Sequence, residues 1–162
     1  MPFSAPKTIG GPNVAAFLDM IAYSELGAPL LAVSDDGYNV LAGSTATRPL
    51  LFASYADHPD IYNRALNSTA AGRYQILYRY WAVDKKRLGL PDFSPASQDL
   101  YAVEQLRLQG ALPLAEAGKF SDAVARARHI WVSLPGAGYG QHENSIELLA
   151  QAYRDAGGVM AA

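Results

Sequence analysis

Glu25 is a charged residue on the otherwise apolar face of an expected helix. In the segment that begins at Asn13, the larger apolar side chains recur at the three- and four-residue offsets of one helix face. These side chains are Val14, Phe17, Leu18 and Ile21. Glu25 continues the series four residues after Ile21. Partial burial and the negative end of a helix dipole both raise the pKa of a carboxyl group. A carboxyl group that stays protonated near neutral pH can act as a general acid. The position also fits an ordinary glutamate at a frayed helix end.

Other residue types that carry chemistry do not form a recognisable pattern. His58, His129 and His142 lack the spacing of a zinc motif, and no acidic cluster surrounds any of them. We expect them to be scattered histidines on the surface or in loops. No serine lies in a nucleophile-elbow motif. The chain has no cysteine, which excludes disulfides, thiolate zinc sites and thiol nucleophiles. These residues therefore predict no metal site.

Two segments rich in small residues could lie close to a ligand. Residues 69–75 lead Arg73, Tyr74 and Gln75 into an expected helix, and Gln75 carries both a hydrogen-bond donor and an acceptor. Residues 135–141 alternate glycines and end with Tyr139 and Gln141, an aromatic face and an amide. The ordinary alternatives are a packed helix N-terminus and a plain turn between helices.

Composition restricts the class of protein. The chain has 162 residues, of which 50% are hydrophobic and 17% charged, and its formal net charge is -2. These values fit one compact soluble domain and give no basic field for nucleic acid. No stretch approaches the ~20 apolar residues of a membrane helix, and the N-terminus does not resemble a signal peptide. We expect a cytoplasmic protein without membrane insertion.

The order of predicted elements indicates an α+β fold that is mostly helical. After a loose lead-in at 1–12, a single domain is expected over 13–162. Its first helix ends near Gly27 and Pro29, and turn signals in 30–67 predict a small antiparallel sheet inserted after that helix. From Ser68 onward the pattern is helical. Gly89 should end one helix, Pro95 should stand at the first position of the next, and the last helix should begin near Asn144.

Several segments together resemble the lambda-type phage endolysins, which are lytic transglycosylases that degrade peptidoglycan. They are "AFLDMIAYSE", "STAAGRYQILYRYW" with "LGLPDFSPASQD", and "IWVSLPGAGYGQ". The similarity runs from about Val14 to Gly158. It implies a lysozyme-like fold with Glu25 as the single catalytic acid. The implied substrate-binding residues are Ser24, Tyr55, Arg73, Tyr74, Gln75, Tyr139 and Gln141. One departure is that Leu26 and Gly27 follow Glu25, where the family commonly has Gly-Thr.

The resemblance also implies a reaction and a setting. Glu25 would cleave the bond between N-acetylmuramic acid and N-acetylglucosamine with formation of a 1,6-anhydro end. This reaction would require no metal and no cofactor. A monomer would accumulate in the host cytoplasm until a separate holin lets it reach the periplasm at lysis. Two alternatives stay open. One is a hydrolase of the same fold, in which Asp35, Asp36 or Asp57 activates a water. The other is a glycan-binding module without catalysis.

Overall fold

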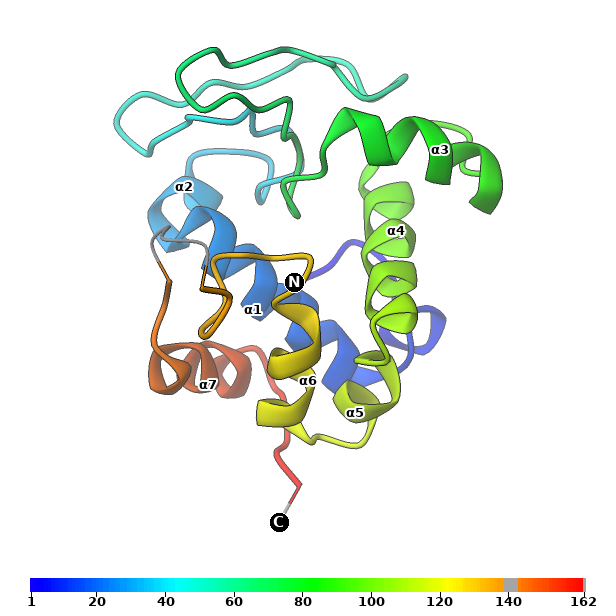
Figure 1. Cartoon of the computed structure of the whole chain (residues 1–162), viewed down its shortest axis with the longest axis vertical. Coiled ribbons are helices and arrows are strands. Elements are labelled where there is room, and N and C mark those ends of the chain that lie inside the picture. Colours follow the sequence, from blue (N-terminus) through cyan, green and yellow to red (C-terminus); the bar gives the residue numbers. More distant parts are fainter. Residues whose placement is uncertain (139–142, 162) are drawn as a thin grey trace. The chain divides into compact units, whose positions relative to one another are not determined.

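The computed structural model describes residues 1–138 and 143–161, and its helices account for most of the regular structure (Figure 1). The helices are η1 (Pro6–Thr8), α1 (Pro12–Leu26), α2 (Ala28–Ala32), α3 (Tyr78–Leu88), α4 (Pro95–Leu108), α5 (Leu112–Glu116), α6 (Phe120–Ala127) and α7 (Ile146–Asp155). The chain divides into two compact units. The first comprises Met1–Ser24 and Ala102–Ala162, and the second comprises Glu25–Tyr101.

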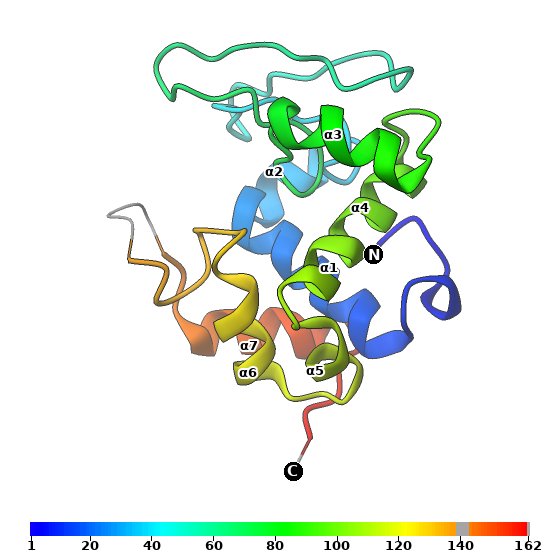
Figure 2. The same ribbon diagram turned by 45° about the vertical axis from the view of Figure 1, so that its right-hand side comes forward.

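The first unit is built around the N-terminal part of α1. The four apolar side chains of the predicted helix face are fully buried there. Phe17 contacts Phe120 of α6 and Tyr153 of α7 edge-on, with ring centroids 6.1 and 6.4 Å apart. In both views α5, α6 and α7 gather around this part of α1 (Figure 1, Figure 2). The predicted stripe is therefore confirmed as buried, and burial extends beyond it to Ala15, Ala16, Met20 and Ala22.

Helix α1 ends where the sequence predicted. Its last residue is Leu26, and Gly27 follows with a positive φ of 74°, a conformation that favours glycine. Pro29 has a different part from the expected one. It occupies the first turn of α2, where the missing N–H of proline costs no hydrogen bond.

The predicted small antiparallel sheet is not confirmed. In the described part of the chain, the segment after α2 forms isolated antiparallel bridges instead of strands. They are Val40–Leu51, Leu41–Ala71, Thr45–Arg48, Asn63–Ser68 and Ala71–Ile76. Residues with positive φ angles stand beside several of these bridges: Gly43 two residues after Leu41, Asn67 next to Ser68, and Gly72 next to Ala71. These turns leave too few consecutive extended residues for a ladder.

Helix α3 begins later than its sequence pattern predicted. Residues 69–76 form a bridged turn in which Gly72 and Gln75 have positive φ, so the helix starts only at Tyr78. The Tyr78 N–H donates to Thr69 Oγ1 at 3.1 Å, which satisfies one of the free N–H groups of the first turn. Gly89 ends the helix in the left-handed conformation, as predicted.

Helices α4 and α7 begin at or near their sequence signals. Pro95 is the first residue of α4, as predicted. Helix α7 begins at Ile146, and Ser145 caps it by accepting the Leu148 N–H at 3.2 Å. Asn144, the predicted start of this helix, does not cap it and instead donates its side-chain amide to the Ser24 carbonyl oxygen. Within 1–138 and 143–161, no helix is both long and apolar enough to cross a membrane.

Candidate active site

The candidate acid Glu25 lies in the last turn of α1 and is half-buried. It belongs to the same unit as Tyr55, Arg73, Tyr74 and Gln75. Its position follows from the helix periodicity that buries Ile21 one turn earlier. The structure thus places the predicted acid at the end of a helix whose other turns are fixed in a core.

Ser24, which precedes the acid, is 9% exposed and is engaged by two distant residues. The Asn144 amide nitrogen donates to the Ser24 carbonyl oxygen at 3.1 Å and to Ser24 Oγ at 3.0 Å. The hydroxyls of Ser24 and Ser133 share a hydrogen bond of 2.8 Å. Sequence reasoning missed Asn144 and Ser133, because their partner lies more than a hundred residues away.

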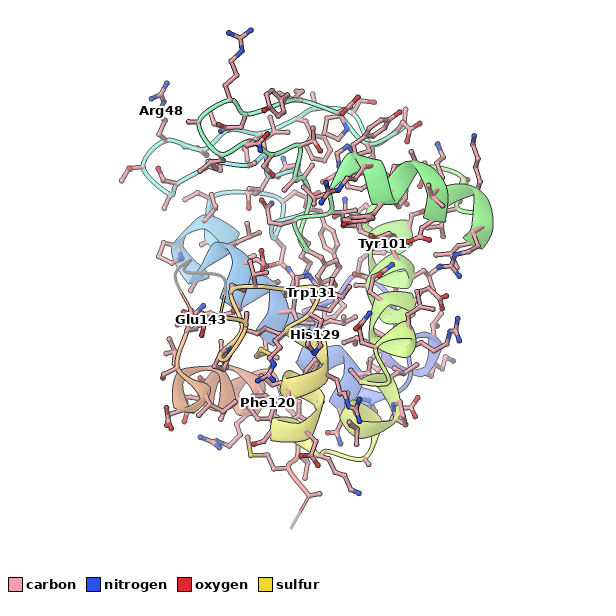
Figure 3. All side chains as sticks on the ribbon, viewed as in Figure 1. Arg48, Tyr101, Phe120, His129, Trp131 and Glu143 are labelled. Atoms are coloured by element: carbon pink, nitrogen blue, oxygen red, sulfur yellow. The ribbon has the colours of Figure 1, made fainter. Side chains whose placement is uncertain are left out.

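The side chain of Glu143 binds the backbone of the glycine-rich segment in its described part, residues 135–138. Both oxygens of the Glu143 carboxylate accept backbone N–H groups, from Gly136 at 2.8 Å and Gly138 at 2.7 Å. These hydrogen bonds lower the pKa of Glu143. Figure 3 labels Glu143 on the segment that precedes α7. The predicted binding residues Tyr139 and Gln141 lie outside the described residues.

Arg73 is buried at the turn that precedes α3, with only 1% of its side chain exposed. Its guanidinium pairs with the Asp36 carboxylate at 2.8 Å and lies 5.2 Å from the ring centroid of Tyr38. Its backbone N–H donates to Gln98 Oε1 at 2.9 Å. The residue therefore ties this turn to the loop after α2 and to α4, which are parts of the same unit.

Tyr74 is likewise buried, and burial raises the pKa of its hydroxyl well above the usual value. Its hydroxyl donates to Asp99 Oδ1 at 2.6 Å. Tyr38 donates to the same oxygen at 2.8 Å. A fully buried carboxyl group is thus satisfied by two phenols, which fixes the turn against α4.

Gln75 keeps part of its side chain exposed. Its backbone has a φ of 48°, and its amide nitrogen donates to the Gly72 carbonyl oxygen at 2.9 Å. This intraloop bond uses one donor of the amide and orients the side chain. Of the predicted triplet, Gln75 is the residue that the turn presents to solvent, while Arg73 and Tyr74 support the turn from within.

Tyr55 is half-buried and donates its hydroxyl to Asp35 Oδ2 at 2.6 Å. Burial raises the pKa of Tyr55, and the hydrogen bond to Asp35 adds to the effect. Its ring packs edge-on against Phe52, with centroids 5.4 Å apart. The side chain is therefore a neutral donor at physiological pH with a fixed ring orientation.

His58 is a buried residue that sequence reasoning assigned to the surface or a loop. Its side chain is 5% exposed and packs against Phe93, with ring centroids 4.7 Å apart. Nδ1 accepts the Asp60 N–H at 3.0 Å, so Nε2 carries the proton and donates to the Ile76 carbonyl oxygen at 2.8 Å. Burial lowers the pKa of His58. Nothing in the local sequence signals this role.

The three aspartates considered for a hydrolase are each hydrogen-bonded. Asp36 pairs with Arg73, and Asp35 accepts the Tyr55 hydroxyl. Asp57 accepts the Lys85 ammonium at 2.9 Å and the Trp81 indole N–H at 2.9 Å. Burial alone would raise the pKa of Asp57, but these two hydrogen bonds, the His58 backbone N–H and the charge of Lys85 together lower it. All three carboxyl groups have structural partners inside their own unit.

Leu26, the residue after the acid, lies close to the backbone of the loop after α2. A Cβ atom on Gly37 would lie 2.7 Å from a Leu26 methyl and 2.9 Å from a Leu31 methyl. Gly37 has a φ of 87°, which also favours glycine. The backbone of the loop after α2 therefore approaches the end of α1 closely enough to require a glycine there.

Comparisons with known proteins agree on one family. The family model described as Endolysin matches residues 15–160. The endolysin of Escherichia phage P2 is 47% identical over 157 residues, which cover 92% of this chain and 95% of that protein. The endolysin of Escherichia phage lambda is 44% identical over 149 residues, which cover 90% of this chain and 91% of that protein.

A solved structure points the same way. The bacteriophage lambda lysozyme complexed with a chitohexasaccharide is similar with a TM-score of 0.84 and 43% identity. The match covers 93% of this chain and 97% of that one. The mostly helical fold of this protein is accordingly lambda lysozyme-like. With matches of this extent in both sequence and structure, the chain belongs to the endolysin family.

Proposed function

We propose that this chain is a lytic transglycosylase that cleaves peptidoglycan glycan strands during host lysis, with Glu25 as its catalytic acid. The observation that carries the proposal is the half-buried Glu25 at the end of α1, in a chain that belongs to the endolysin family. The solved relative bound to a chitohexasaccharide supports a glycan of β-1,4-linked N-acetyl sugars as the ligand class.

The proposed reaction uses Glu25 twice. As an acid, its carboxyl group gives a proton to the glycosidic oxygen, so the bond to C1 of N-acetylmuramic acid breaks and N-acetylglucosamine leaves with a new 4-hydroxyl group. As a carboxylate, it then takes the proton of the 6-hydroxyl of the same N-acetylmuramic acid while that oxygen bonds to C1. The acid is regenerated, and no water is consumed.

One carboxyl group suffices for this chemistry because the nucleophile is already part of the substrate. Ordinary glycosidases need a second carboxyl group, either to activate a water or to attack the sugar. An internal hydroxyl held next to C1 avoids the entropy cost of bringing two molecules together. The structural partners of Asp35, Asp36 and Asp57 support this one-acid scheme.

The remaining predicted residues receive parts that fit their environments. We propose that Gln75 and Tyr55 contact the glycan, because both keep polar or aromatic surface accessible. Arg73 and Tyr74 shape the turn that presents Gln75, and direct substrate contact by these two buried side chains stays a prediction. Substrate binding by Tyr139 and Gln141 also stays a prediction.

Product analysis tests the reaction type. Mass spectrometry of digested peptidoglycan should show 1,6-anhydromuramic acid ends, which are lighter than reducing ends by one water. Reducing muramic acid ends would instead support the hydrolase, the alternative with an activated water.

Substitution of the acid tests the assignment of Glu25. Glu25→Gln keeps the shape of the side chain and removes the transferable proton, so turnover should fall by about 10²- to 10⁴-fold. Glu104→Gln is a matched control on α4, where Glu104 pairs with Arg107. A Glu25→Gln variant that lyses walls at the wild-type rate would refute the proposed acid. Wall binding without lysis by both the wild type and this variant would support the binding-module alternative.

The proposed setting can be tested separately. We propose that the chain acts as a monomer and accumulates in the host cytoplasm until a separate holin opens the inner membrane. Expression of the chain alone should leave cells intact, and co-expression with a holin should lyse them. Lysis without a holin would contradict this dependence. Size-exclusion chromatography with light scattering should give a mass near 17.4 kDa.

A further inference from the structure

We propose that Asn144, together with Ser133, is a positioning residue for the catalytic acid Glu25. The inference rests on the proposed function, because it assigns these two residues a part in the reaction of Glu25. Its basis is the set of hydrogen bonds that hold Ser24, the residue joined to Glu25 by a peptide bond.

The side-chain amide of Asn144 uses both of its N–H groups to bind Ser24. An amide nitrogen carries two hydrogens. Its two acceptors here are the carbonyl oxygen of Ser24 at 3.1 Å and the hydroxyl oxygen of Ser24 at 3.0 Å. No other group of similar size offers two donors from one atom without a charge. The contact therefore specifies asparagine by its chemistry as well as by its volume.

The carbonyl that Asn144 binds belongs to the peptide group that carries Glu25. It lies in the last turn of α1, where carbonyl oxygens have no partner further along the helix. A hydrogen bond from a distant side chain fixes the tilt of this peptide plane. Because the Ser24 carbonyl carbon is bonded to the Glu25 nitrogen in one planar peptide group, the same hydrogen bond also restricts the position of the Glu25 Cα.

Ser133 completes the arrangement from the other end of the same segment. Its hydroxyl meets the Ser24 hydroxyl at 2.8 Å, and its carbonyl oxygen accepts the Asn144 backbone N–H at 3.0 Å. Ser133 and Asn144 thus hold each other as well as Ser24. The Glu143 carboxylate, adjacent to Asn144, binds Gly136 and Gly138 of the intervening segment. Ser24 is consequently held by two residues that also bind each other.

The restraint on Ser24 matters for catalysis because a general acid must be placed accurately. A general acid must come within about 2.6–3.2 Å of the oxygen that it protonates. A displacement of about 1 Å can cost about 10²-fold in rate. A freely fraying last turn would allow displacements of this size, since helix ends are the least restrained part of a helix. Asn144 and Ser133 remove that freedom at the residue before the acid.

The test compares variants that remove the donors in different ways. Asn144→Asp keeps the shape of the side chain and replaces the donor with an oxygen, whereas Asn144→Leu keeps a similar volume without introducing charge. Ser133→Ala removes one hydroxyl, and Ser133→Thr restores it. Kinetics are measured on soluble, uncrosslinked glycan strands with alternating N-acetylglucosamine and N-acetylmuramic acid.

The chain offers a matched control at the opposite end of the same helix. Asn13 of α1 also donates its amide to a backbone carbonyl, that of Glu116 at 3.2 Å, and accepts the Val159 N–H at 2.9 Å. Asn13→Asp and Asn13→Leu disturb α1 by the same chemical changes, far along the helix from Glu25. Circular dichroism and thermal unfolding give the folded fraction of every variant, by which kcat is corrected.

We expect both Asn144 variants to lower the corrected kcat by about 10- to 100-fold with KM within about twofold of the wild type. Ser133→Ala should lower kcat less, Ser133→Thr should restore it, and the Asn13 variants should keep it. An unchanged kcat in the Asn144 variants would overturn the inference. A rise in KM at unchanged kcat would also overturn it, because that result assigns Ser24 and its neighbours to direct substrate contact.

Glu25→Gln in the same assay separates this inference from the proposed function. If Glu25→Gln keeps its turnover, the proposed acid is wrong and the positioning role fails with it. If Glu25→Gln is inactive while the Asn144 variants turn over normally, only the positioning role is refuted.

Discussion

Tyr74 and Asp99, 25 residues apart in the chain, meet through a hydrogen bond of 2.6 Å between the phenolic hydroxyl and Oδ1. Both side chains are buried, and the Tyr38 hydroxyl reaches the same oxygen. The contact joins α4 to the turn at residues 69–76, which exposes Gln75 to solvent. The shape of the candidate binding turn thus depends on the buried Asp99 carboxylate, at which α4, the turn and the segment of Tyr38 meet within one unit.

Tyr74→Phe should destabilise the protein measurably. The substitution removes only the hydroxyl and leaves Asp99 with one fewer donor, which costs about 1–3 kcal/mol for a buried polar group. Tyr62→Phe is the matched control, because the Tyr62 hydroxyl bonds Asn67 at 2.6 Å on an exposed side chain. It should stay within about 0.5 kcal/mol of the wild type. Urea denaturation measures both, and equal losses would contradict the structural importance of the buried contact.

Stability should fall with pH below the ordinary pKa of histidine because of His58. Burial lowers the pKa of His58 in the folded protein, so the unfolded chain binds more protons between the lowered pKa and about 6.5. The stabilising contribution is therefore complete above about 6.5 and is lost as pH falls through this window. Protonation would also set a second N–H of the imidazole against the Asp60 N–H that Nδ1 accepts.

His58→Gln should flatten this part of the stability profile. Denaturant unfolding at a series of pH values between 7 and 5 measures the slope. His129→Gln is the control, because His129 is exposed and its removal should leave the slope unchanged. An identical slope in the wild type and the His58 variant would assign the pH dependence to other groups.

Gly72→Ala should be far more destabilising than Gly89→Ala, although both glycines have positive φ angles of 78° and 65°. A Cβ at Gly72 would lie 2.2 Å from Gln98 Oε1, whereas a Cβ at Gly89 meets nothing within 4 Å. Gln98 cannot yield cheaply, because its amide is buried and bonds the Tyr38 and Phe93 carbonyls.

We expect a loss of about 1–2 kcal/mol for Gly89→Ala, the cost of the left-handed conformation alone. Gly72→Ala adds about 1–3 kcal/mol for overpacking. Thermal unfolding of the two variants measures the difference. Similar melting temperatures would show that the turn adjusts and that Gln98 does not fix it.

Glu143→Gln should loosen the described part of the glycine-rich segment. The carboxylate accepts from Gly136 and Gly138 with both oxygens, and a neutral amide can accept with only one. The amides of these two glycines should exchange with deuterium faster in the variant. Since the hydrogen bonds lower the pKa of Glu143, the wild type should keep its protection until pH falls through that lowered pKa. Equal exchange rates in both proteins would show that the Glu143 carboxylate does not protect these two amides.

The sequence by itself determined the features that depend on near neighbours in the chain. The apolar spacing before Glu25 predicted α1 and its buried face, because helix periodicity is local. Pro95 and Gly89 marked a helix start and a helix end for the same reason. Long motifs such as the segment that ends in Gln141 were sufficient to indicate the endolysin family before any coordinates.

Only the tertiary structure decided which distant polar groups pair. The partners of Ser24 lie 109 and 120 residues away, and a buried amide finds its acceptors through packing that no local pattern encodes. The same reason explains the burial of His58. The predicted sheet failed for another reason: turn signals favoured strands, but in the described residues the turns at Gly43 and Gly72 limited pairing to single bridges. Local chemistry selects elements, whereas long-range contacts select which polar side chains become structural and which remain available for a substrate.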